Sequence, residues 1–378
     1  MASSYINDGL SKAVPVVSSY YLIRDSQRGR SGDSIEFLIQ ETDLKDSFPR
    51  LLRDLHDIGL IATAGRSSYS SRLTPALSSN LVVSEGIVIT IYKRQPEQSA
   101  RKKRIPIHLI LFVATVTVVF VDGMSKSNAY SNFFANDPTV LASVYTLSLI
   151  GILGIHEMGH MIAAKSHGLK VSWPYFIPSV PVFFLSPTFG AMIRLRSNMP
   201  NRNAMFDVGI SGPVAGLIVA IVVSTYGATI SVVVPADTKL SGGYAIQPSL
   251  IMMATIQLAG KALSGGVLVW SPVLMSAWIG FLVTFLNLLP AWQLDGGHLA
   301  RAAVGSKWHR ILTYSSIGVL LATGWYFMAA LVLMLSFRYP ESVPLDDVTP
   351  LSRKRKLLFL VALGTAAVCA SPFPAFFA

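Results

Sequence analysis

The sequence predicts an all-α polytopic membrane protein of about six transmembrane helices, with a small soluble α+β domain at its N-terminus. Hydrophobic residues make up 52% of the 378 residues and charged residues only 13%, whereas soluble domains carry about 25% charged residues. The charges are also unevenly placed, since residues 1–104 hold 26 of the 51 Asp, Glu, Lys and Arg residues. Residues 105–378 are too poor in charge to form a water-facing surface, which excludes a single soluble enzyme and a disordered chain.

The N-terminal part divides into a tail and a small domain. Residues 1–33 show little hydrophobic periodicity and are expected to be a flexible tail. Alternating apolar residues at 35–39 predict a strand, apolar residues at helical spacing over 48–55 predict a helix, and residues 81–92 indicate one or two further strands. Residues 34–100 are therefore expected to form a soluble α+β domain. It contains no catalytic pattern, which favours a docking or regulatory role.

Residues 101–378 are expected to form the membrane domain, in which six apolar runs are long enough to cross about 30 Å of hydrocarbon as helices. The runs lie near residues 105–122, 139–165, 206–234, 267–290, 311–337 and 356–377. Because Lys and Arg resist translocation, the basic cluster at 101–104 predicts a multi-pass protein of the cell membrane with a cytoplasmic N-terminal domain. A second basic cluster at 353–356 follows the fifth run. If successive spans cross the membrane in alternating directions, this cluster lies outside, which conflicts with the preference of Lys and Arg for the inner side.

The formal net charge of +11 raises nucleic-acid binding as an alternative. Both basic clusters, however, stand directly before apolar runs, where Lys and Arg typically flank membrane spans and contact lipid head groups. We therefore expect a lipid bilayer around the chain and no nucleic-acid partner. The single cysteine, Cys369, excludes an intramolecular disulfide and a cysteine-based zinc site. The sequence does not indicate an oligomeric state.

Residues 171–193 do not fit a helix, because prolines interrupt an aromatic-rich segment. These prolines are Pro174, Pro178, Pro181 and Pro187. Non-helical apolar backbone at membrane depth is tolerated only where protein covers it or where it lines a wet cavity. We expect a re-entrant loop or β-hairpin beside a water-accessible site; an interfacial loop anchored by aromatic residues is the alternative.

The second predicted span contains the sequence His156-Glu157-Met158-Gly159-His160. Positions i and i+4 lie on one face of a helix, so both imidazoles can bind one Zn²⁺ with Glu157 alongside. With seven His and six Glu in the chain, roughly 0.002 matches to this pattern are expected by chance. An ionisable group inside a membrane costs roughly 2.5–3.5 kcal/mol on insertion scales. Both arguments favour a functional site over a polar contact between helices.

Two histidines leave a catalytic zinc site one protein ligand short. Asp295, within the segment 287–298, is the best third ligand, because Pro290 ends the fourth span and Gly296 and Gly297 allow close backbone approach. His298 is a rival ligand. The other acidic residues of the apolar region are explained by loops, by capping or pairing, or by a span end: Asp122, Asp137, Asp207, Asp237 and Glu341.

The pairing of His156-Glu157-x-x-His160 with Asn287-x-x-Pro290-x-x-x-Leu294-Asp295-Gly296 resembles the site-2 protease family of intramembrane zinc metalloproteases. The segments Phe189-Gly190-Ala191 and Gly212-Pro213-Val214-Ala215-Gly216 also resemble family members. The pattern looks closest to archaeal and plastid-type members, without the PDZ-like insertion of many bacterial relatives.

This resemblance implies one Zn²⁺ per chain, bound by His156, His160 and Asp295, with Glu157 as the general base. It also implies that Asn287 assists near the scissile carbonyl, although a helix-packing amide is the alternative for this residue. The implied substrates are transmembrane proteins, cut in or near their membrane segments during regulated intramembrane proteolysis. A helical substrate must unwind locally, and the 171–193 segment is a candidate to pair with it as an added strand.

Two other functions remain open at this point. A zinc-binding or zinc-transporting membrane protein could use the same His and Asp residues, but it does not require Glu157 as a base. A catalytically inactive scaffold is disfavoured because no ligand or base is missing from the pattern.

Overall fold

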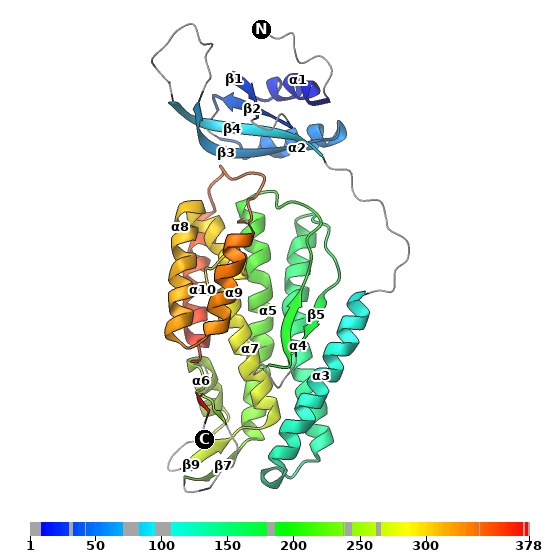
Figure 1. The fold of residues 1–378 in the computed structure, drawn as a ribbon, viewed down its shortest axis with the longest axis vertical. Helices are drawn as coiled ribbons and strands as arrows, with labels where there is room; N and C mark the ends of the chain where they lie inside the picture. The colour runs from blue at the N-terminus through cyan, green and yellow to red at the C-terminus, as the bar shows by residue number, and fades with distance from the viewer. Residues whose placement is uncertain are drawn as a thin grey trace. The chain divides into compact units, whose positions relative to one another are not determined.

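The computed structural model describes residues 9–29, 33–41, 43–70, 83–94, 107–179, 186–236, 238, 244–261, 266–339, 341–372 and 375–376. The chain forms two compact units, whose elements are drawn in Figure 1. The first unit comprises Met1–Lys103, Asn198–Met205 and Val343–Ser352; the second comprises Arg104–Ser197, Phe206–Ser342 and Arg353–Ala378. The basic cluster at 101–104 and Asp237 lie outside the described residues.

The first unit is an antiparallel sheet of order β1-β2-β4-β3 with short helices. Its elements are η1 (Gly9–Lys12), α1 (Ala13–Ser18), β1 (Ile23–Arg28), β2 (Ser34–Ile39), α2 (Phe48–Asp57), β3 (Leu60–Ser70) and β4 (Val83–Lys93). The alternation predicted for β2 places Ile35, Phe37 and Ile39 in one core with Leu51 and Leu55 of α2. The strand and helix expected in this part of the sequence are therefore present.

Residues 9–28 differ from the flexible tail expected over residues 1–33. They form η1, α1 and the edge strand β1, and Leu10, Ala13 and Val17 are buried in the core of the first unit. These apolar residues are three to four positions apart, but a six-residue helix is too short for periodicity to stand out. The edge strand β1 is mostly polar and partly exposed, so it gave no hydrophobic signal either.

Two segments from later in the chain extend the same sheet. Ala64 of β3 forms a parallel bridge with Asp346, and its N–H donates to the carbonyl of Leu345 at 2.7 Å. The N–H of Leu345 in turn donates to the carbonyl of Met199 at 2.8 Å. The first unit therefore includes residues 198–205 and 343–352, which lie within the membrane domain that the sequence predicts.

The second unit is mostly helical, as expected for a polytopic membrane protein. Its larger helices are α3 (Ile107–Ala129), α4 (Pro138–Ser166), α5 (Arg202–Thr229, whose first residues belong to the first unit), α7 (Pro272–Leu288), α8 (Asp295–Ala322), α9 (Tyr326–Arg338) and α10 (Arg353–Cys369). The smaller elements are η2 (Ser131–Phe133), β5 (Tyr175–Pro178), β6 (Thr188–Met192), β7 (Val232–Pro235), β8 (Tyr244–Ala245), α6 (Leu250–Leu258), β9 (Gly266–Val269) and β10 (Ala375–Phe376). Tyr145 and Leu149 of α4 and Trp278 and Phe281 of α7 lie in one buried core.

Three helices of the described chain, α3, α4 and α5, are long and apolar enough to cross a membrane, and α7 and α9 are shorter apolar helices. The β-hairpin expected within residues 171–193 is present as β5 and β6, which pair antiparallel with Tyr175 opposite Met192. The tip of this hairpin lies outside the described residues. The count of six spans stays a prediction.

Two details of the expected spans are wrong. Asp122, expected in a loop, lies in α3, where its carboxylate accepts a hydrogen bond from the Tyr145 hydroxyl at 2.6 Å and pairs with Lys126. The expected fifth span at 311–337 is two helices, because α8 ends at Ala322 and the turn contains Gly324 at φ 84°, a conformation that glycine adopts at no steric cost.

Helix α9 returns along α8, since Glu341, just beyond α9, lies beside Ser306 and His309 of α8. The chain therefore comes back to the end of α8 that carries these residues. Further along, Arg355 pairs with Asp207, which also contacts His167 at the end of α4. Arg355 of the basic cluster at 353–356 therefore lies beside the end of α4 and the beginning of α5.

Candidate metal centre

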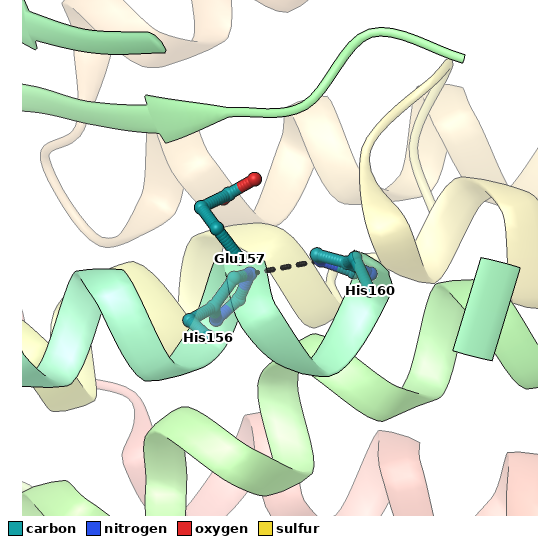
Figure 2. A group of neighbouring side chains, drawn as sticks. All are labelled: His156, Glu157 and His160. Atoms are coloured by element: carbon teal, nitrogen blue, oxygen red, sulfur yellow. Dashed lines mark hydrogen bonds between the residues drawn. The ribbon is translucent and has the colours of Figure 1, made fainter. Parts of the chain in front are cut away.

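Helix α4 carries the two histidines and the glutamate of the metal-binding motif. The helix begins at Pro138 with Asp137 as its N-cap, whose side chain accepts from the N–H of Thr139 at 2.7 Å. His156, Glu157 and His160 are 3%, 5% and 6% exposed. Figure 2 shows the two imidazoles side by side on the helix, with the Glu157 side chain extending away from it. The motif therefore lies on a helix, at the spacing that its sequence predicts.

Asp295, the first residue of α8, completes a triangle of donor atoms with the two histidines. Its Oδ2 lies 3.3 Å from Nε2 of His156 and 3.2 Å from Nε2 of His160, and the two Nε2 atoms are 3.1 Å apart. In a tetrahedral zinc site with bonds of about 2.0–2.1 Å, neighbouring ligand atoms are about 3.3 Å apart. The three side chains therefore fit a tetrahedral Zn²⁺ with one position left for water or substrate.

The second ring nitrogen of His160 is bound by α5. Nδ1 lies 2.6 Å from the backbone carbonyl of Val208, an acceptor, so Nδ1 carries the proton and Nε2 offers its lone pair to the metal position. Helix α5 can approach this closely because residue 212 is glycine. A Cβ atom there would overlap the His160 ring.

The Glu157 carboxylate lies close to the two imidazoles. The ligand atoms of His156, Glu157 and His160 all lie within 4.8 Å of one another. The backbone of Ile193, directly after β6, hydrogen-bonds to the Glu157 carboxylate. The hairpin β5–β6 therefore holds the glutamate from the side opposite to its own helix.

Asn287 comes from a third helix, α7. Its Nδ2 lies 3.5 Å from Nε2 of His156, although the two residues are 131 positions apart in the sequence. The amide therefore lies beside one of the two imidazoles. The same distance also fits the alternative of an amide that packs helices together.

The other candidate ligands are not brought to this triangle. Within the described chain, no ion pair or hydrogen bond joins His298 to His156 or His160. Asp207 pairs with Arg355 and His167, as expected for a residue engaged in pairing. Glu341 pairs with His309 and Arg301. Asp207 and Glu341 therefore have partners of their own, whereas the Asp295 carboxylate lies against both imidazoles.

Sequence reasoning missed the groups that orient the motif. The carbonyl of Val208 and the backbone of Ile193 make these contacts. Both residues have aliphatic side chains, so no pattern of residue types could have identified them as part of the site. Gly212 was noted only as part of a segment resembling a family. Its role, space for the His160 ring, depends on how closely α4 and α5 approach each other.

Comparison with known proteins agrees with this site. Residues 144–331 match the model of peptidase family M50. The chain is 30% identical over 223 residues to the probable zinc metalloprotease EGY1, chloroplastic, of Arabidopsis thaliana, which covers 57% of this chain and 40% of that protein. It is likewise 30% identical over 238 residues to the probable zinc metalloprotease EGY2, chloroplastic, of the same plant, covering 59% and 40%.

A rice protein, the probable zinc metalloprotease EGY1, chloroplastic, of Oryza sativa subsp. japonica, is 30% identical over 227 residues, covering 56% of this chain and 38% of its own length. The chain thus spans about two fifths of the length of these curated relatives. The matched region contains every residue of the donor triangle, Glu157 and Asn287.

Proposed function

The chain carries a peptidase family M50 domain at residues 144–331, and on this premise we propose that it is an intramembrane zinc metalloprotease. The observation that carries the proposal is the triangle of His156, His160 and Asp295 donor atoms at 3.1–3.3 Å, with the Glu157 carboxylate beside it. This is the resemblance to site-2 proteases that the sequence indicated.

His156, His160 and Asp295 are the proposed ligands of one Zn²⁺ per chain. Two imidazole nitrogens and one carboxylate oxygen are a donor set that zinc accepts at a catalytic site. Zinc bound there lowers the pKa of water and polarises a carbonyl group. The Val208 carbonyl supports this assignment, because it holds His160 in the tautomer that presents Nε2.

Glu157 is the proposed general base. Its carboxylate accepts a proton from the attacking water and returns it to the amide nitrogen that leaves. The hydrogen bond from the Ile193 backbone holds the carboxylate in place. Asn287 is proposed to donate its amide hydrogens to the carbonyl oxygen of the bond being cut.

The proposed substrates are transmembrane proteins, hydrolysed in or near their membrane segments. An extended substrate offers backbone groups that can pair with a strand edge, and the β5–β6 hairpin reaches Glu157 through Ile193. The hairpin is therefore the element against which an unwound substrate would lie. Residues 34–100 are proposed to act in substrate access or regulation, since they contain no metal-binding pattern.

We further propose that the protein lies in the cell membrane with its N-terminal domain in the cytoplasm, because the basic cluster at 101–104 precedes the first apolar helix. Single cysteines replacing the exposed Lys165 and Lys307, in a Cys369→Ser background, test this orientation. Both should react with a membrane-impermeant thiol reagent only in inverted vesicles. Labelling of both on intact cells would reverse the topology.

The function is tested by zinc analysis of the purified full chain coupled to cleavage of membrane-segment substrates. Glu157→Gln should keep one zinc per chain, because the residue is not a ligand, and should lower hydrolysis by about 10²–10⁴-fold. A zinc transporter would instead keep its transport and show no hydrolysis in either protein. Full hydrolysis by the Glu157→Gln variant would contradict the mechanism.

A further inference from the structure

The turn at residues 289–294, which joins α7 to Asp295, contains a strained backbone. Trp292, three residues before Asp295, has φ 45° and is the one non-glycine residue in the left-handed region within the described chain. A bulky residue adopts this conformation only when its surroundings hold it there.

Both backbone polar groups of Trp292 are bound by α8. Its N–H donates to Oγ1 of Thr313 at 3.1 Å, and its carbonyl accepts from Nε2 of His309 at 3.0 Å. His309 and Thr313 are four positions apart and so lie on one face of α8. One helix face therefore fixes the turn at its strained residue.

His309 is itself held by Glu341. The ring is 4% exposed, and Nδ1 lies 3.2 Å from Oε2 of Glu341. The carboxylate and the Trp292 carbonyl are both acceptors, so both ring nitrogens of His309 donate. Glu341 also accepts from the Ser306 hydroxyl and lies 3.3 Å from Nε of Arg301. The hydrogen bond from His309, with those further contacts, lowers the pKa of Glu341 to about 2.

The first turn of α8 packs directly on this carbonyl. A Cβ atom at Gly297 would overlap the carbonyl oxygen of Trp292, and one at Gly296 would overlap the carbonyl of Leu288. A shift of Trp292 is therefore transmitted to the residues that immediately follow Asp295. Glu341 and His309 are thus linked to Asp295 through the backbone of the Trp292 turn.

We propose that His309 and Glu341 are positioning residues for the third metal ligand: they hold the Trp292 turn, place Asp295 against His156 and His160, and so raise the affinity of the site for zinc. This inference rests on the proposed function, because the position of Asp295 matters for affinity only if Asp295 binds the metal.

The test compares purified full-length variants by competition for Zn²⁺ against a chelating indicator, and by the absorption spectrum of the Co²⁺-loaded protein, which reports ligand geometry. Glu341→Gln keeps the shape of the side chain and removes its charge, and His309→Ala removes both hydrogen bonds. Groups that orient a metal ligand typically contribute 10–100-fold in affinity, so each variant should weaken zinc binding by about that factor and alter the Co²⁺ spectrum.

A matched pair isolates the Trp292 turn. Thr313→Val removes the acceptor of the Trp292 N–H, whereas Thr115→Val removes a buried hydroxyl of α3 that bonds only to the Leu111 carbonyl of its own helix. The first should weaken zinc binding and the second should leave it unchanged. Wild-type affinity in Glu341→Gln and His309→Ala, or equal losses in both threonine variants, overturns the inference. A wild-type protein that binds no zinc overturns the proposed function instead.

Discussion

His156 and His160 lie one turn apart on the continuous helix α4, whereas Asp295 begins a different helix after a strained turn. In the first half of the site, helical geometry alone brings two imidazoles to one face. In the second half, the proposed ligand Asp295 follows a turn that contacts from His309 and Thr313 hold, with Glu341 bound to His309. A metal centre can therefore combine one half that local helical periodicity builds with another half that tertiary contacts build.

The largest effect is expected from removing Asp295, the proposed ligand that tertiary contacts bring to the two histidines. Asp295→Ala should lose most bound zinc and, with it, hydrolysis, because two histidines alone leave the metal weakly held. His298→Ala is the matched control, since His298 follows in the same turn of α8 but is not joined to the two histidines. The zinc content of both variants, measured on folded protein, shows which of the two residues is the third ligand. If the Asp295→Ala variant retained its zinc and the His298→Ala variant lost it, His298 would be the third ligand.

A second change tests whether the positions of His156 and His160 depend on α4 alone or also on α5. Gly212→Ala places a Cβ atom on the His160 ring, and should therefore weaken zinc binding by an order of magnitude or more through displacement of that ligand. Gly151→Ala, on α4 itself, meets no atom within 4 Å and should leave zinc affinity and stability near wild type. Affinity measurements on the pair check the prediction. Equal affinities would show that α5 does not confine the ring.

The smallest expected effect concerns the start of α4. Asp137→Ala removes the N-cap of the helix, which typically lowers stability by about 0.5–2 kcal/mol. The metal-binding motif lies almost twenty residues further along, so zinc affinity should stay unchanged while the unfolding midpoint falls slightly. Serine at the same position should restore the midpoint. A loss of zinc affinity in this variant would mean that fraying of the first turn reaches the motif.

The spacing of His156 and His160 predicted their common face, because the helical repeat is a local property of the chain. The Pro-rich composition of residues 171–193 likewise predicted a non-helical segment, and β5–β6 is the hairpin that was expected. The helix α2 and strand β2 followed from periodicities of 3.6 and 2 in the same way. In each case one short stretch of sequence contained the whole signal.

Other features depended on contacts between distant segments and had no local signal. The run at 311–337 contains no charged residue, and only the turn at Gly324 together with the contacts of Glu341 shows that α9 folds back along α8. Residues 9–28 entered the core of the first unit through a helix and a strand too short for their periodicity to be recognised.

The sequence alone predicts a membrane protein with a His-Glu-x-x-His motif in an apolar helix, because composition and helical spacing are properties of the chain. Tertiary structure decided the rest of the centre. It brought Asp295 and Asn287 to His156 across more than 130 residues, oriented His160 with the Val208 carbonyl, and held the Trp292 turn with His309. Those contacts involve backbone groups and distances between helices, which residue identity does not encode locally.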